Sequence, residues 1–126
     1  MAKPLPGPDL RWLKIDDIVN RAKKKRRWSA RQATEAREYY EAFLRLSHGR
    51  KTPLRAIHKN ADVIWHEHIL ETKRYRADCE RIFGPGYYLD HNPSTRAMQT
   101  PTAIKRAQGV YAPYGLVSPN VGVPCY

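Results

Sequence analysis

The segment 61–84 reads ADVIWHEHILETKRYRADCERIFG, and the spacing of its apolar and aromatic residues decides the fold. Every third or fourth position carries a side chain suited to a buried face, which is the periodicity of an α-helix. Neighbouring apolar residues widen this face. The segment therefore predicts helical structure with a histidine and a cysteine in its core seam. The inward positions are Ile64, His68, Thr72, Tyr75, Cys79 and Ile82, flanked by Trp65, Ile69 and Phe83.

Three histidines and one cysteine in this region suggest a metal site, because zinc takes four ligands from His, Cys and carboxylates. The candidate ligands are His66, His68, Cys79 and His91. Two residues that lie two positions apart on a helix differ by about 200° in direction. His66 and His68 therefore face opposite sides, and the protease pattern H-E-x-x-H is not met. We favour structural histidines and no cofactor, with a zinc or iron site as the alternative.

Signatures of catalysis are weak in this chain. The sequence contains no nucleophile elbow, no glycine-rich phosphate loop and no zinc-ribbon spacing. Gly84-Pro85-Gly86 is a helix stop followed by a turn, and it does not have the pattern of a phosphate cradle. We therefore name no catalytic residue and expect a protein that is not an enzyme.

Cap and stop signals divide the rest of the chain into helices. Apolar spacing predicts a helix over 10–27, and the capping-box pattern from Ser29 to Gln32 begins a second one that ends at His48-Gly49. Asn60 is expected to cap the next helix. This helix is either continuous over 61–83 or, as we favour, followed after a break by a fresh helix that Thr72 caps. Thr52-Pro53 predicts at most one extra turn. Near 101–108 a short helix follows Thr100.

These signals predict a small all-α domain of three to four helices over residues 10–91. A Pro-rich arm, residues 1–9, precedes it, because alternating prolines favour an extended chain. An extended and irregular C-terminal arm, residues 92–126, follows it. This arm keeps more apolar and aromatic residues than a disordered linker usually has. We expect it to lie against its own domain or against a neighbour. Docking on a partner is favoured, through Tyr111, Tyr114, Leu116, Val117 and Tyr126.

The net charge of +11 at pH 7 is concentrated in residues 1–59. An acidic partner is expected there, either nucleic acid or the acidic surface of another protein. The alternative is that these cations form a solvated helix face without a partner and complement the helix dipole. No known nucleic-acid recognition motif supports sequence-specific reading. The candidate contact residues are Arg21, Lys23, Lys24, Lys25, Arg26, Arg27 and Arg31.

Two cysteines, Cys79 and Cys125, do not make a disulfide framework, so a reducing compartment is expected. An intermolecular bridge through Cys125 stays open. No apolar run is long enough to span a membrane, and the N-terminus lacks the apolar stretch of a secretory signal. A cytoplasmic or virion location follows as the expectation.

The stretch 61–93 resembles a motif of the bacterial and plant glycine-rich-domain-protein-like family. The motif runs Asp-x-x-Trp-His-x-His-x-Leu, then Tyr, Asp-Cys, Phe-Gly and a later His. The resemblance implies little more than a helical module with unusual histidines, and it covers about a quarter of the chain. The matching residues are Asp62, Trp65, His66, His68, Leu70, Tyr75, Asp78, Cys79, Phe83, Gly84 and His91.

Together these features favour a non-enzymatic, small basic structural or adaptor subunit that docks through its arms into a larger assembly. A phage virion or another nucleoprotein particle is one concrete form of this hypothesis. Its partners would be protein subunits, with nucleic acid as a further candidate. The alternatives are a metal-binding helical protein and a weakly specific nucleic-acid-binding module. The sequence leaves the oligomeric state open.

Overall fold

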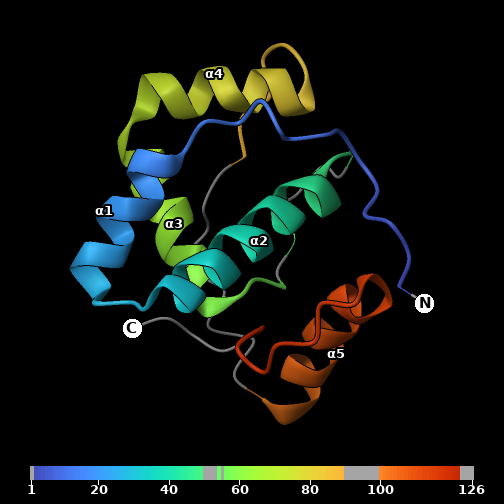
Figure 1. The fold of residues 1–126 in the computed structure, drawn as a ribbon. Coiled ribbons are helices and arrows are strands. Elements are labelled where there is room, and N and C mark those ends of the chain that lie inside the picture. The colour runs from blue at the N-terminus through green and yellow to red at the C-terminus, as the bar shows by residue number, and fades with distance from the viewer. Residues whose placement is uncertain (1, 50–53, 55, 90–99, 123–126) are drawn as a thin grey trace.

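The computed structural model describes residues 2–49, 54, 56–89 and 100–122. These residues form five α-helices, one short 3-10 helix and no strand beyond an isolated bridge, so the predicted all-α fold is confirmed. In Figure 1, α2 crosses the middle of the molecule; α1 and α3 pack against it, and α4 packs on α3. In chain order they are α1 (Asp16–Arg26), α2 (Ala30–Ser47), α3 (Lys59–Leu70), α4 (Thr72–Phe83), α5 (Pro101–Tyr111) and the 3-10 helix η2 (Ala112–Tyr114).

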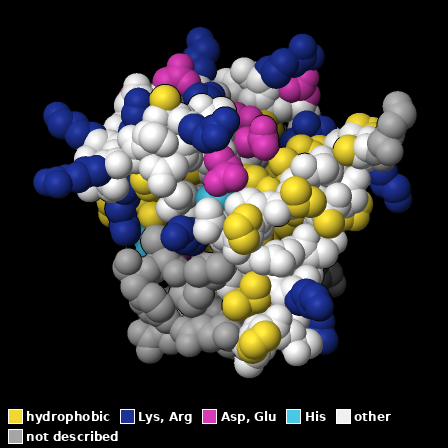
Figure 2. Space-filling model, turned by 60° about the horizontal axis from the view of Figure 1, so that its bottom comes forward, with side chains coloured by type: hydrophobic (Ala, Val, Ile, Leu, Met, Phe, Trp, Pro, Cys, Tyr) yellow, Lys and Arg dark blue, Asp and Glu magenta, His cyan; other side chains and the backbone are white. Residues whose placement is uncertain are grey.

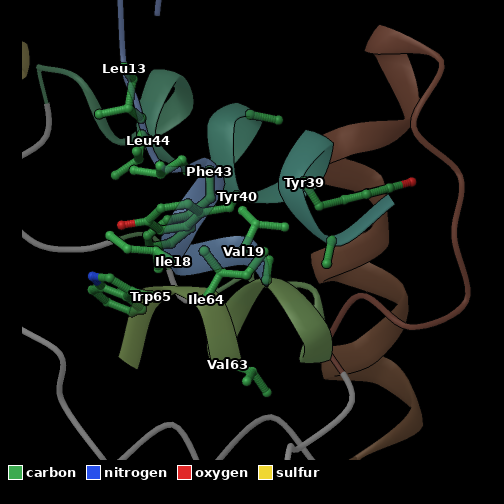
Figure 3. Packing of buried hydrophobic residues seen from close by; sticks show 14 of the residues in the cluster. Leu13, Ile18, Val19, Tyr39, Tyr40, Phe43, Leu44, Val63, Ile64 and Trp65 are labelled. Atoms are coloured by element: carbon green, nitrogen blue, oxygen red, sulfur yellow. The ribbon is translucent and has the colours of Figure 1, made fainter. Parts of the chain in front are cut away.

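The core lies where α1, α2 and α3 meet. Tyr40 and Phe43 of α2 and Ile64 of α3 are fully buried, and Trp65 packs its ring on Phe43 at 4.8 Å between centroids. Ile18 and Val19 of α1 close the same cluster, as Figure 3 shows. Continuous burial of apolar surface across three helices is what holds a domain of this size together.

Helix α1 begins at Asp16, six residues later than predicted. Leu10, Leu13 and Ile15 are all buried, and this spacing does not fit one helical face. The chain instead turns at Leu10, whose carbonyl accepts from the Leu13 amide at 2.9 Å. Tertiary burial of these three residues therefore overrides the apolar spacing that predicts a helix over 10–27.

Helix α2 begins and ends as predicted. The Ser29 hydroxyl accepts from the Gln32 amide at 3.1 Å, and the Gln32 side chain accepts from the Ser29 amide at 2.8 Å. This is a complete capping box. After His48, Gly49 adopts a left-handed φ of 82°, which suits the glycine that follows a helix.

The predicted break in the motif region is present, but its caps differ from the prediction. Helix α3 ends at Leu70 and α4 begins at Thr72, with Glu71 between them as the cap residue of both. Thr72 is therefore the first helical residue and not the cap. At the start of α3, His58 and not Asn60 is the cap.

The N-terminal arm lies along α2. The Arg45 guanidinium donates to the carbonyls of Leu5 at 2.7 Å and Pro6 at 3.0 Å. Gly7 passes so close to Arg45 that an added Cβ would lie 2.6 Å from its carbonyl oxygen. The Lys3 amide donates to the Pro113 carbonyl at 2.8 Å. Residues 2–9 form no helix or strand and are held against the domain.

The C-terminal residues also pack on the domain. Helix α5 is capped by Thr100 as predicted, but it continues past Gly109 to Tyr111 because Tyr111 is drawn into the core. Val121 is fully buried and forms a β-bridge with His58. Thr52-Pro53 and Cys125 lie outside the described residues. Among those described, no helix is long and apolar enough to cross a membrane.

Candidate functional site

His68 of α3 sits at the centre of a buried hydrogen-bonded chain. Its Nε2 lies 2.8 Å from the Asp78 carboxylate and its Nδ1 lies 2.7 Å from the Tyr40 hydroxyl. A carboxylate only accepts, so Nε2 carries the proton, Nδ1 accepts, and Tyr40 donates. The imidazole is 1% exposed, and Tyr75 packs against it edge-on. Three elements, α2, α3 and α4, are thereby joined through one side chain.

A second buried chain runs beside the first. The Trp65 indole donates to the Tyr75 hydroxyl at 2.8 Å, and Tyr75 donates to the Leu89 carbonyl at 2.5 Å. Burial raises the pKa of Tyr75 far above its ordinary value of 10. The phenol therefore stays protonated and acts as a fixed donor that holds the segment after α4 against the core.

Asp78, His68 and Tyr40 are arranged like the orienting carboxylate, the base and the nucleophile of a catalytic triad. The buried position of Tyr40 argues against catalysis. Tyr40 is 0% exposed, and burial raises the pKa of its phenol well above 10. A nucleophile must reach its substrate and lose its proton, and Tyr40 is placed to do neither. The geometry serves to satisfy buried polar groups.

The four predicted metal ligands are not brought together in the described residues. His66 is exposed, whereas His68 is buried on the opposite side with both ring nitrogens engaged. Cys79 is 1% exposed within the core, and His91 lies outside the described residues. In the described part of the chain, no group of three or more His, Cys, Asp or Glu side chains could hold a metal.

A second buried histidine, His58, was not singled out from the sequence. Its Nδ1 accepts from the amides of Asn60 at 3.1 Å and Ala61 at 3.4 Å, which caps α3. Nε2 therefore carries the proton and donates to the Glu35 carboxylate at 3.1 Å. Burial lowers the pKa of His58 below 6.5, and the Glu35 hydrogen bond opposes that shift. Its sequence signal, a polar residue before a helix, is shared by Asn60.

The cations of α1 divide into two groups. Arg21 lies 3.2 Å from the Glu67 carboxylate and 2.9 Å from that of Glu71, and Lys25 lies 2.8 Å from Glu67. These two residues join α1 to α3. The other predicted contact residues form no ion pair with any described carboxylate. We call this second group the basic corner, and its members are Lys23, Lys24, Arg26, Arg27 and Arg31.

The basic corner has a fixed backbone. Arg27 takes a left-handed conformation with φ 56°, and both its amide and that of Trp28 donate to the Lys23 carbonyl. Trp28 is 9% exposed and anchors the turn in the core. Four of the five cations are exposed and Lys23 is half-buried. In Figure 2, where the lower part of Figure 1 comes forward, Lys and Arg side chains project from the edge of the molecule.

The predicted docking residues of the tail are placed differently from one another. Tyr111 is 0% exposed, and its hydroxyl donates to the Ala56 carbonyl. Tyr114 and Leu116 are half-buried, and Val117 is 74% exposed. Tyr126 lies outside the described residues. The Tyr111 ring is therefore committed to this chain's own core.

Fold and site define a small, basic all-α protein whose buried histidines hold helices together. Within that class, a family described as UCP032817-like matches residues 15–116, and the chain belongs to this family. The predicted glycine-rich-domain-protein-like membership is therefore wrong. That prediction rested on a short motif, of which Trp65, His68, Tyr75 and Asp78 are used for internal packing. No curated protein and no solved structure matches the chain.

Proposed function

We propose that the protein is a non-enzymatic basic adaptor subunit that docks onto an acidic partner in a larger assembly, such as a nucleoprotein particle. The observation that carries this proposal is the basic corner. Its five cations have no described carboxylate partner, whereas the nearby Arg21, Lys25 and Arg37 are all paired. Unpaired cations on one rigid surface create a positive field that attracts an acidic partner.

The buried polar groups also favour a non-catalytic role. Tyr40, His68 and Tyr75 have the side-chain types of a catalytic site, yet each is closed off from solvent and satisfied by a neighbour. Such networks fix the relative positions of helices. A rigid body that presents one charged surface is suited to binding.

The proposal is tested by sedimentation of the tagged, full-length protein in a cell extract. Two variants are compared, each losing five positive charges. The corner variant is K23Q/K24Q/R26Q/R27Q/R31Q. The matched control variant changes five exposed cations elsewhere and is K3Q/K14Q/K73Q/K105Q/R106Q.

We expect the wild type and the control variant to sediment with a large particle at low salt, and the corner variant to sediment as a free protein. High salt should release the wild type and the control variant from the particle, because it screens exposed charges. The proposal fails if the wild type sediments as a free protein at low salt, or if the corner variant stays with the particle.

A further inference from the structure

We infer that the acidic partner of the basic corner is the phosphate backbone of a nucleic acid, an inference that rests on the proposed function. The corner is uniform in charge. Between Asp17 and Glu35 the sequence has no acidic residue. A surface of one sign matches a polyanion, whose charges also have one sign and recur at short intervals.

The chemistry of the corner does not fit an acidic protein surface. Protein interfaces are centred on apolar and aromatic anchors and are depleted in lysine. The aromatic residue next to the corner, Trp28, is buried and unavailable to a partner. The exposed large hydrophobics of the described residues lie on other segments, at Leu70, Tyr87, Tyr88 and Val117.

The side chains available at the corner are suited to contacts with phosphates. Its lysines and arginines are long, flexible side chains that donate to phosphate oxygens. The Gln32 side chain, which could otherwise reach a base edge, is held in the capping box by the Ser29 amide. Binding is therefore expected to be weakly specific in sequence and strongly dependent on salt.

The test is fluorescence anisotropy with the full-length protein, using a short labelled DNA duplex, an RNA of the same length and poly-glutamate as probes. Each neutralised phosphate of a duplex contributes about −0.9 to the slope of log K against log salt. Five corner contacts predict a slope near −4.5. The affinity should then fall on the order of several hundredfold between about 50 and 200 mM salt.

The corner variant should lose most of this slope and bind the duplex at least tenfold more weakly at low salt. The slope of the control variant should differ from that of the wild type by no more than the contribution of about one phosphate contact. Equal losses in the two variants would overturn the inference, because net charge alone would then explain binding. Binding to poly-glutamate without binding to nucleic acid would overturn it while leaving the proposed function standing. Binding to neither would defeat both.

Discussion

At the residue scale, each of the two buried histidines has hydrogen-bond partners at both ring nitrogens. His68 donates to Asp78 and accepts from Tyr40, and His58 donates to Glu35 and accepts from two backbone amides. A neutral imidazole has one donor and one acceptor, so both rings are fully satisfied. Their roles are to connect α2 to the start and the end of α3.

Replacing Tyr40 by Phe removes the hydroxyl that donates to His68 and leaves the ring in place. The buried Nδ1 then has no donor, so the free energy of unfolding should fall by about 1–3 kcal/mol. Urea unfolding measures this change. Tyr88→Phe, at a ring that is 37% exposed, is the matched control and should change stability by less than about 0.5 kcal/mol. Equal effects of the two substitutions would show that the hydrogen bond from Tyr40 to His68 contributes nothing to stability.

The burial of His58 predicts that the free energy of unfolding falls on acidification. Burial lowers the pKa of His58 in the folded protein below 6.5, so the unfolded chain binds a proton first. The stability that His58 contributes is complete above about pH 6.5 and is lost as the pH falls towards its folded pKa. Urea unfolding across this range measures the slope.

The control for this prediction is His58→Asn, since asparagine caps a helix without titrating. This variant should be less stable at neutral pH and should show a shallower loss between about pH 7 and 5. A variant with the same pH dependence as the wild type would place the effect on other groups.

The sequence predicted the direction of His68 but did not identify Tyr40 as its partner. Helical spacing alone puts His68 inward with Ile64 and Tyr75. Tyr40, its hydrogen-bond donor, is 28 positions away on a helix whose packing angle no local pattern specifies. Glu35 and His58 were missed for the same reason, because their contact depends on how α2 crosses the start of α3.

At the scale of the element, prediction succeeded where a local signal decides the structure. The capping box of α2 and the Thr100 cap of α5 involve residues close in sequence. It failed at the start of α1 and the end of α5, where Leu10 and Tyr111 are drawn into a core built from distant segments. Burial of a large side chain outweighs the few tenths of a kcal/mol by which helix propensities differ.

The junction of α1 with α3 depends on Glu67, whose carboxylate is paired with Lys25 and Arg21. The hydrogen bond from Lys25 holds the pKa of Glu67 below its ordinary value of 4.5, so this pairing stabilises the fold above about pH 4.5 and is lost as the pH falls. Both cations are partly exposed, so Glu67→Gln should cost only about 1–2 kcal/mol.

Urea unfolding at neutral pH tests this cost. Glu80→Gln, at an exposed position on α4, is the control and should be near neutral. If Glu67→Gln also proves neutral, the ion pairs seen at the junction do not hold α1 in place.

At the scale of the whole molecule, the described residues of both terminal segments, 2–9 and 100–122, pack on the same body. The Ser118 amide donates to the Tyr39 hydroxyl at 2.8 Å, and the Gly122 amide donates to the Ile57 carbonyl at 2.9 Å. Figure 3 shows Tyr39 pointing towards α5. Residues 100–122 therefore contribute to the stability of the domain.

Tyr111→Ala should destabilise the whole domain, because it empties a fully buried aromatic site. The expected cost is about 3–5 kcal/mol, measured by thermal or urea unfolding as a single transition. Val117→Ala, at a side chain that is 74% exposed, should be nearly neutral. If Tyr111→Ala instead leaves the main transition unchanged, α5 is an appendage and not part of the domain.

The most direct test of nucleic-acid binding is the mapping of backbone amide chemical shifts while a short DNA duplex is titrated into the full-length protein. The account predicts that shifts centre on residues 21–32, that α4 and α5 are spared, and that the shifts disappear when salt is raised. Shifts centred on α5 and Val117, or no shifts at low salt, would contradict it.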